Sequence, residues 1–382
     1  MARYEVLTTA TAAEFARPFL DGDPIACDEI GDGNLNYVFR VSTATSSVIV
    51  KQAPPYLRVA GEGWPLSRSR AEVEARALPV HAKHCPLALP SLLGYDEDLS
   101  VLVLEDLREH ITWREEIIEG RYSAGVAELV GRYCADVLVG TSDVALSVTE
   151  RNALKRDFGY TDLCALTANL VLTAPFVDDE SNRLDDHLIE AAAALRVDKA
   201  LQGRVAELRF TFMTRAEALV HGDLHTGSVM VNGDDVRVID LEFAFFGPLG
   251  LDPGMLMANL ALSRLCKEVS GDHAGALYLD GAALDFWSSF VDGVARQWPA
   301  RQPWMHRFLS GVLTDAARFA GAEMVRRIVG LAHVKDVDRL PLPLRSEVQA
   351  RALAGGRALL LAGPVRTVGE LWHIAISEDS YL

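Results

Sequence analysis

The stretch VHGDLHTGSVMVNGDDVRVIDLEFAFFGP, residues 220–248, decides the fold of this chain. Short runs of apolar residues predict two strands, LVHGD, which begins one residue before this stretch, and VRVID, and SVMVNGDD joins them. Asn232-Gly233 in the connection is a strong signal for a tight hairpin turn. Polar residues lie at the ends of both expected strands, which predicts a catalytic or binding site there. These residues are His221, Asp223, His225, Asp240 and Glu242.

The composition of the 382-residue chain allows a large buried core, because 49% of its residues are hydrophobic and 24% are charged. A chain of this length predicts two lobes or domains rather than one. No segment approaches about twenty uninterrupted apolar residues, and the first residues lack the features of a signal peptide, so we expect a cytoplasmic protein. The formal net charge of −16 would repel polyphosphate backbones. Nucleic acid and anionic membranes are therefore not expected as partners.

The pattern of the chain changes near residue 105. Strand-like runs before it predict a small antiparallel sheet with one inserted helix, whereas apolar residues after it recur at helical spacing. We predict an α+β, bilobal fold with a small antiparallel-sheet N-terminal lobe over residues 1–107, a hinge at about 105–107, and a larger, mainly helical C-terminal lobe over residues 108–382. A ligand would bind in the cleft between two such lobes. The expected strands are PIACDEI, NYVFRVST, SSVIVKQA and LSVLVLEDL, and the longest expected helices cover residues 111–140, 184–219 and 304–333.

A glycine turn, a lysine and a glutamate follow one another in the expected N-terminal lobe. Gly31 and Gly33 in GDGNLNYVFRV let the backbone turn tightly and bring its amides close to an anion, although a lone G-x-G turn is more often an ordinary hairpin. Lys51 ends the apolar strand VIVK, and the helix SRAEVEARAL offers Glu72 or Glu74 as the partner that a buried ammonium needs. In this order the three parts match those with which the small lobe of a protein kinase holds a nucleotide.

The carboxylates of the quoted stretch suit different tasks. Asp223 opens a loop after a strand, where a carboxylate could orient a substrate hydroxyl or accept its proton. Asp240 and Glu242 are two residues apart, so both would face the same side of an extended segment and could bind Mg²⁺. The alternative for such a pair is that it caps turns or helices. We expect His221 to hydrogen-bond the loop, and His225 could border the substrate.

These motifs together resemble those of a known family. VHGDLHTGSVMV and VIDLEFAFFGPLGLDPG resemble the catalytic and metal-binding segments of 5-methylthioribose kinases, a branch of the aminoglycoside phosphotransferase and choline kinase group with a protein-kinase-like fold. EIGDGNLNYVFRV is similar to that family's glycine-rich loop, and GAEMVRRIVGLAHVKDVD is similar to its twin-arginine helix. The resemblance spans most of residues 28–340.

The resemblance implies roles for individual residues. Asp223 would be the catalytic aspartate, and Arg326 and Arg327 would hold the sugar and the transferring phosphate, although an arbitrary arginine pair more often lies at the surface. Lys51 would contact the ATP phosphates, and the backbone of residues 105–107 would receive the adenine. The alignment favours Glu74 over Glu72 as the partner of Lys51. The implied nucleotide-binding residues are Gly31, Gly33, Asn36, Lys51, Glu74, Glu105 and Leu107.

Two positions and one segment depart from the patterns of related kinases. Ser228 stands where aminoglycoside kinases usually carry asparagine, which moves the expected metal binding towards Asp240 and Glu242. Leu241 lies where the family is expected to carry proline, and LGLDPG replaces a segment closer to GFDIG. The changes at Leu241 and in LGLDPG remove no metal ligand, but both bear on the shape of the substrate pocket.

The expected protein is a kinase that uses ATP and Mg²⁺ to phosphorylate the 1-hydroxyl of 5-methylthioribose, a step of methionine salvage. The resemblance also implies a homodimer. One alternative is a kinase of the same fold for another alcohol, such as a 5-deoxypentose, an aminoglycoside or a choline-like amine. The other is a pseudokinase that binds nucleotide without transfer. The C-terminal tail after Ala362 has no expected role beyond packing of Trp372 and Tyr381.

Overall fold

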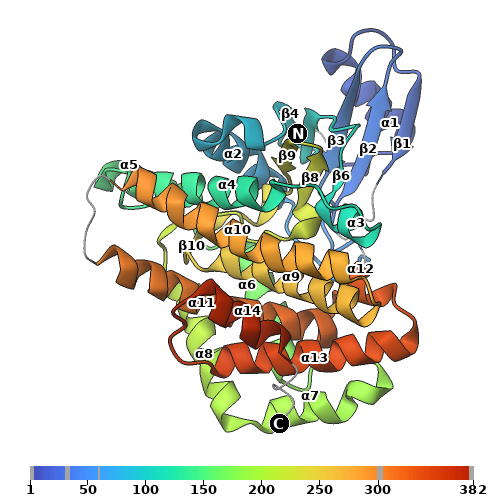
Figure 1. Cartoon of the computed structure of the whole chain (residues 1–382). Coiled ribbons are helices and arrows are strands. Elements are labelled where there is room, and N and C mark those ends of the chain that lie inside the picture. Colours follow the sequence, from blue (N-terminus) through green and yellow to red (C-terminus); the bar gives the residue numbers. More distant parts are fainter. Residues whose placement is uncertain (1–3, 31–34, 59–60, 299–303, 378–382) are drawn as a thin grey trace. The chain divides into compact units, whose positions relative to one another are not determined.

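The computed structural model describes residues 4–30, 35–58, 61–298 and 304–377. Gly31 and Gly33 lie outside the described residues, so the expected glycine turn stays a prediction. The chain forms two compact units (Figure 1). Unit 1 contains residues 1–110 and 237–244, and unit 2 contains residues 111–236 and 245–382.

Unit 1 is built on a five-stranded antiparallel sheet with the order β1-β2-β3-β5-β4. The first four residues of β5 are apolar and buried, because an interior strand is covered on both faces. The sequence did not reveal β4, whose LLGYD run carries few β-branched residues. The strands are β1 (Ala26–Glu29), β2 (Tyr37–Ser42), β3 (Ser47–Gln52), β4 (Leu92–Asp96) and β5 (Val101–Glu105).

A short helix that the sequence did not predict covers one face of this sheet. α1 (Thr9–Ala16) begins at a capping box in which Thr8 and Thr11 satisfy each other's backbone amides. Ala12 and Ala16 of α1 are fully buried in a cluster with apolar side chains of the central strands. The small alanine side chains allow the helix to lie close to the sheet. The strand residues of that cluster are Phe39, Val41, Val48, Val50, Val101 and Val103.

The inserted helix of unit 1 is α2 (Ser69–His84), as the sequence predicts. Arg70 and Glu74 are four residues apart, share one face of α2 and are both buried. This helix packs against η6 (Leu241–Phe243), a 3-10 turn far along the chain. The sequence assigned residues 237–244 to the C-terminal part, but they are grouped with unit 1 because of these contacts.

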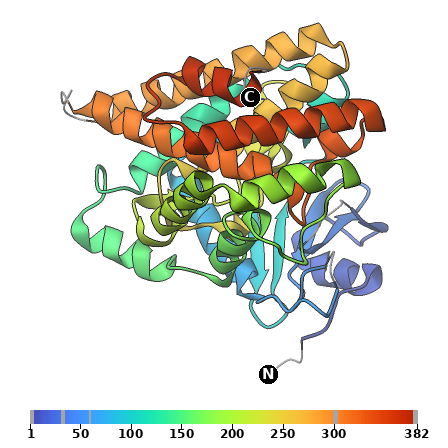
Figure 2. The ribbon, with the colours of Figure 1, turned by 90° about the horizontal axis from the view of Figure 1, so that it is seen from below.

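Unit 2 is mainly helical. α9, α10, α11 and α13 pack side by side, and α4 packs along α10 (Figures 1 and 2). α9 is buried almost around its whole circumference, which explains why its sequence shows little polar face. The long helices are α4 (Val126–Gly140), α8 (Lys199–Thr214), α9 (Leu251–Val269), α10 (His273–Gln297), α11 (Met305–Val329) and α13 (Leu342–Leu361). The shorter ones are α3 (Trp113–Ile118), α5 (Val148–Asp157), α6 (Asp162–Leu170), α7 (Ile189–Val197), α12 (Lys335–Asp338) and α14 (Val368–Ile376).

Two of the long expected helices are interrupted. The 111–140 segment forms a strand, α3 and α4, and the two helices are separated by a stretch in which Gly120 and Gly125 have φ values of 74° and 79°, outside helical geometry. The 184–219 segment is divided by Asp198, whose side chain accepts from two backbone amides and caps α8. The 304–333 segment forms one continuous helix, α11.

The strands after residue 110 pair differently from the prediction. β7 (Ala218–Val220) pairs with β10 (Phe245–Gly247), not with the VRVID run. The Asn232-Gly233 turn instead connects β8 (Val229–Asn232) to β9 (Asp235–Val238), and β8 also pairs with β6 (Ile111–Thr112). Gly233 has a φ of 58°, as the turn requires. The turn was recognised, but its first strand was placed one strand too early in the chain.

The predicted α+β class, with a small antiparallel sheet in the N-terminal part and mainly helices in the rest, is confirmed. In the tail, Trp372 is buried and its indole Nε1 donates to Asp280 Oδ1 at 2.8 Å, whereas Tyr381 lies outside the described residues. No helix in the described part of the chain is long and apolar enough to span a membrane.

Candidate active site

The lysine of β3 lies between two carboxylates in unit 1. Lys51 Nζ is 2.7 Å from Glu74 Oε2 and 2.6 Å from Asp240 Oδ1. Lys51 and Glu74 are buried, whereas the Asp240 side chain is 48% exposed. Glu72 pairs with Arg76 at 3.3 Å instead. Of the two glutamates that the sequence left open, Glu74 is therefore the partner of Lys51.

The environment keeps this lysine charged. Burial by itself lowers the pKa of Lys51, but the carboxylates of Asp240 and Glu74 outweigh it and place that pKa above its usual value. Burial raises the pKa of Glu74 to about 7, although the Lys51 ammonium opposes this shift. A permanently charged, buried ammonium is suited to contact phosphate oxygens.

Glu242 is held by two polar side chains of unit 1. Asn36 Nδ2 donates to both carboxylate oxygens, at 2.9 and 3.0 Å, and Arg70 Nε lies 3.3 Å from Glu242 Oε2. Arg70 Nε also donates to Asn36 Oδ1 at 3.1 Å. The three side chains are buried, so Glu242 has a fixed orientation.

The sequence argument assumed that Asp240 and Glu242 lie on an extended segment, but the structure shows that they do not. Asp240 has φ 67° and ψ 53°, a left-handed conformation that non-glycine residues seldom adopt and that is frequent at functional sites. Glu242 follows in the turn η6. The two carboxylates therefore have different partners, Lys51 for Asp240 and Asn36 with Arg70 for Glu242.

The two carboxylates fit the requirements of Mg²⁺. This ion binds hard oxygen atoms and usually takes one or two protein carboxylates together with nucleotide phosphates and water. Asp240 is half-exposed and can take a ligand, and Glu242 is oriented by neutral and cationic donors. In the described ranges, no three or more His, Cys, Asp or Glu side chains form a group that could hold a metal ion alone.

The expected adenine-binding segment follows β5. Asp106 is anchored, because its carboxylate accepts from Arg40 Nε at 2.9 Å and from Ser47 Oγ at 2.7 Å. Glu105 accepts from the Ser91 amide, and the Leu107 carbonyl accepts from the His110 amide. These bonds fix the course of the segment at the end of the sheet.

The loop that contains His221, Gly222 and Asp223, called the HGD loop below, lies in unit 2 and is held by an aspartate of α9. Asp252 accepts from the backbone amides of His221 at 2.7 Å and Gly222 at 2.9 Å. Gly222 has a φ of 87°, which only glycine adopts readily. Burial raises the pKa of Asp252, against the opposing effect of His221 and of the two amides. The Asp223 side chain that follows is 26% exposed.

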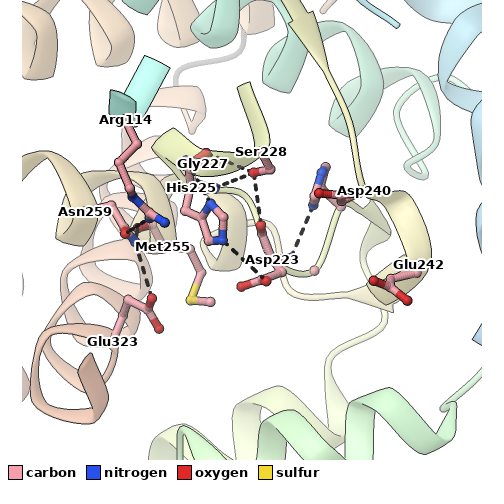
Figure 3. A network of polar contacts seen from close by, with 12 residues as sticks. Arg114, Asp223, His225, Gly227, Ser228, Asp240, Glu242, Met255, Asn259 and Glu323 are labelled. Atoms are coloured by element: carbon pink, nitrogen blue, oxygen red, sulfur yellow. Dashed lines mark hydrogen bonds and ion pairs between the residues drawn. The ribbon is translucent and has the colours of Figure 1, made fainter. Parts of the chain in front are cut away.

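Hydrogen bonds between Ser228 and the backbone of His225 stabilise the turn that follows. Ser228 Oγ accepts from the His225 amide at 2.9 Å and donates to the His225 carbonyl, also at 2.9 Å (Figure 3). The serine that replaces the expected asparagine therefore holds the loop. A Cβ atom at Gly227 would lie 2.7 Å from Arg114 Nη1, so a larger residue there would force a neighbouring side chain to shift.

The twin arginines of α11 are buried rather than at the surface. Both hold Glu323, with Arg326 Nε at 2.5 Å from Oε2 and Arg327 Nε at 2.7 Å from Oε1. Arg326 Nη2 also lies 3.6 Å from Asp223 Oδ1. Burial alone would raise the pKa of Glu323, but the two guanidinium groups outweigh it and lower that pKa.

A third arginine extends this network. Arg114 of α3 donates to Asn259 Oδ1 at 2.7 Å, and Asn259 Nδ2 donates to Glu323 Oε1 at 3.3 Å (Figure 3). Arg114 Nε also lies 3.2 Å from Asp336 Oδ2. Arg326 thus links the loop aspartate to a buried network of paired charges in unit 2.

Sequence reasoning did not find several residues that shape the site. Glu323 could have been found, because it precedes the arginines by three and four residues on a helix. Arg70 likewise precedes Glu74 by four residues. Asp252 and Asn259 gave no local signal, since their partners are distant in the sequence. The missed residues are Arg70, Arg114, Asp252, Asn259 and Glu323.

Comparison with known proteins identifies the class. The model of the phosphotransferase enzyme family matches residues 27–306, and the chain belongs to this family. A methylthioribose kinase of Bacillus cereus (strain AH187) is 38% identical over 369 residues, which cover 94% of this chain and 93% of that protein. A methylthioribose kinase of Yersinia pseudotuberculosis serotype O:1b is 39% identical over 383 residues, covering 95% of this chain and 94% of that protein.

Solved structures also resemble the chain. A spectinomycin phosphotransferase matches with a TM-score of 0.47 and 10% identity, covering 98% of this chain and 100% of that one. A choline/ethanolamine kinase family protein from Mesorhizobium loti matches with a TM-score of 0.46 and 14% identity, covering 96% and 98% of the two chains. The family resemblance inferred from the HGD loop and the twin-arginine helix is confirmed by the family match and the curated relatives.

Proposed function

We propose that this enzyme transfers the γ-phosphoryl group of ATP to the 1-hydroxyl of 5-methylthioribose. The relatives that share 38–39% of their residues with the chain over nearly its whole length are named methylthioribose kinases. The observation that carries the proposal is the buried, charged Lys51 between Glu74 and Asp240, an arrangement suited to hold nucleotide phosphates.

The residues of unit 1 would bind the nucleotide. Lys51 contacts phosphate oxygens, and Glu74 keeps its ammonium in place. Asp240 and Glu242 would hold Mg²⁺, which would neutralise charge on the phosphates. The backbone of residues 105–107 would receive the adenine, and the role expected for Gly31 and Gly33 is to bring backbone amides to the phosphates.

The residues of unit 2 would bind and activate the sugar. Asp223 accepts a hydrogen bond from the 1-hydroxyl and takes its proton as the sugar oxygen bonds to the γ-phosphorus. The bond between that phosphorus and the bridging oxygen breaks, and ADP leaves. Arg326, beside Asp223, and Arg327 offset the negative charge of the transferring group.

A coupled assay of ADP release tests this proposal. The purified protein is supplied with Mg-ATP and, separately, 5-methylthioribose, 5-deoxyribose, ribose, choline and kanamycin. A strong preference for 5-methylthioribose is expected. Activity on another alcohol alone would keep the phosphotransferase and overturn the substrate, whereas nucleotide binding without turnover of any compound would indicate a pseudokinase.

We also propose that the protein is a homodimer, which is supported only by the family resemblance. Sedimentation equilibrium of the purified chain, whose calculated mass is 41.7 kDa, distinguishes a dimer from a monomer. A single species at the monomer mass would overturn this part of the proposal without affecting the reaction.

A further inference from the structure

The two ring nitrogens of His225 have different partners. The backbone N–H of Gly227 donates to Nδ1 at 3.0 Å, so Nδ1 must be an acceptor without a proton. In a neutral imidazole the single proton then lies on Nε2. The loop therefore sets the tautomer of this histidine.

The surroundings keep the ring neutral. Burial lowers the pKa of His225 well below its usual value, and the guanidinium groups of Arg114, Arg327 and Arg326 add to this effect. Glu323 opposes the shift but does not reverse it. The ring consequently presents one N–H donor, at Nε2, at neutral pH.

That donor approaches the loop aspartate. His225 Nε2 lies 3.6 Å from Asp223 Oδ2, and Arg326 Nη2 lies 3.6 Å from the other oxygen, Oδ1 (Figure 3 shows His225 beside Asp223). Both separations are longer than a hydrogen bond, and such contacts often shorten when a substrate binds. Each oxygen of the Asp223 carboxylate thus faces a different donor, His225 Nε2 at Oδ2 and Arg326 Nη2 at Oδ1.

The ring is also confined. A Cβ atom at Gly227 would lie 2.9 Å from His225 Cε1, so the glycine lets the turn fold tightly over the ring. The His225 amide is held by Ser228 Oγ at 2.9 Å. The His225 side chain is 16% exposed, which leaves it little room for another rotamer.

We propose that His225 is a positioning residue that donates from Nε2 to Asp223 and fixes the orientation of its carboxylate for the sugar hydroxyl. This role rests on the proposed function, because it acts through Asp223. His225 does not accept the substrate proton, since Nε2 already carries one and Nδ1 is engaged by the Gly227 amide. The remaining lone pairs of Asp223 stay available to the substrate.

Two substitutions separate the two nitrogens. His225→Asn places an amide oxygen near the position of Nδ1, which can still accept from Gly227, but it has no group at Nε2. His225→Gln can place an amide N–H near the position of Nε2, but it loses the acceptor at Nδ1. Positioning predicts that kcat falls about 10- to 100-fold in His225→Asn and less in His225→Gln, with the KM for ATP unchanged in both.

The opposite order would overturn the proposal. If His225 only caps the turn, His225→Asn keeps the capping bond and retains more activity than His225→Gln. Thermal unfolding of both variants shows whether a loss of kcat follows a loss of folding. Equal kcat values for His225→Asn and the wild type in a folded protein would also overturn it.

A spectroscopic measurement is independent of the reaction. Nitrogen-15 NMR of histidine-labelled protein, assigned with the His225→Gln variant, should show a protonated Nε2 and an unprotonated Nδ1 for His225 between pH 6 and 8. A proton on Nδ1 instead of Nε2 would refute the proposal that Nε2 donates to Asp223. If the wild type does not phosphorylate 5-methylthioribose but the Nε2–H tautomer is observed, the proposed function fails while the loop geometry stands.

Discussion

Replacing Arg70 by lysine should destabilise unit 1 strongly, although the charge is kept. The buried guanidinium contacts five oxygen atoms, whereas an ammonium has three donors at a single point. At least two oxygens would therefore lose this partner, and at least one of them would be left with none, because Glu242 Oε2 also accepts from Asn36 Nδ2. The five acceptors are the carbonyls of Leu35, Pro54 and Ser67 and the side chains of Asn36 and Glu242.

The magnitude follows from these contacts. A buried acceptor left without a partner costs about 1–3 kcal/mol, so one or two such acceptors predict a loss of about 1–6 kcal/mol in the free energy of unfolding. Arg76→Lys on the same helix is the matched control. The Arg76 side chain is 41% exposed and pairs with Glu72, so its replacement should change that free energy by less than about 0.5 kcal/mol.

Urea unfolding followed by circular dichroism measures both variants. Hydrogen exchange read by mass spectrometry in peptides of α2 and β3 should place the loss in unit 1. A change below about 1 kcal/mol in Arg70→Lys, or exchange protection equal to that of the wild type, would refute the argument that all five acceptors depend on the guanidinium.

Three further predictions follow from the site. Asp223→Asn should lower kcat by about 10²- to 10⁴-fold while the Kd for ATP, measured by calorimetry, stays near the wild-type value; full turnover would exclude the proton-accepting role. Chelation by EDTA should abolish transfer, with recovery on added Mg²⁺, and Asp240→Asn should raise the Mg²⁺ concentration at half-maximal rate; activity that persists in EDTA would contradict the metal. Because the pKa of His225 is lower in the folded state than in the unfolded one, the unfolded state binds the extra proton and stability is lost as pH falls below about 6.5, by at most about 1.4 kcal/mol per pH unit. Urea titrations at pH 7 and pH 5.5 should show a smaller loss in His225→Asn than in the wild type, and equal losses would contradict the lowered pKa.

The parts of the site that were predictable are those whose residues lie close together in the sequence or follow one another in a recognisable order of elements. Lys51 closes an apolar run and Glu74 lies on the following helix, so a buried pair was one of two expected outcomes. The Asn232-Gly233 turn was recognisable because its backbone angles demand those residue types. The strand that this turn joins to β9 was not predictable, because the HGD residues could follow a strand in either of the two arrangements.

Parts that depend on tertiary contacts were not predictable. The role of Arg70 arises from three carbonyl groups in separate segments, and no side-chain pattern marks a carbonyl acceptor. Asp240 was expected on an extended segment, and only the left-handed conformation explains why it faces Lys51 while Glu242 faces Asn36. Helix α9 was missed because a helix buried on nearly all sides lacks the polar face that reveals amphipathic periodicity.

The most direct test of the account is the identity of the product. Phosphorus-31 NMR of a reaction with Mg-ATP and 5-methylthioribose should show ADP and one new phosphate signal coupled to the anomeric proton. The same mixture with Asp223→Asn should show no such signal over the same period. A phosphate coupled to another sugar position, or equal product from the Asp223→Asn variant, would contradict the account.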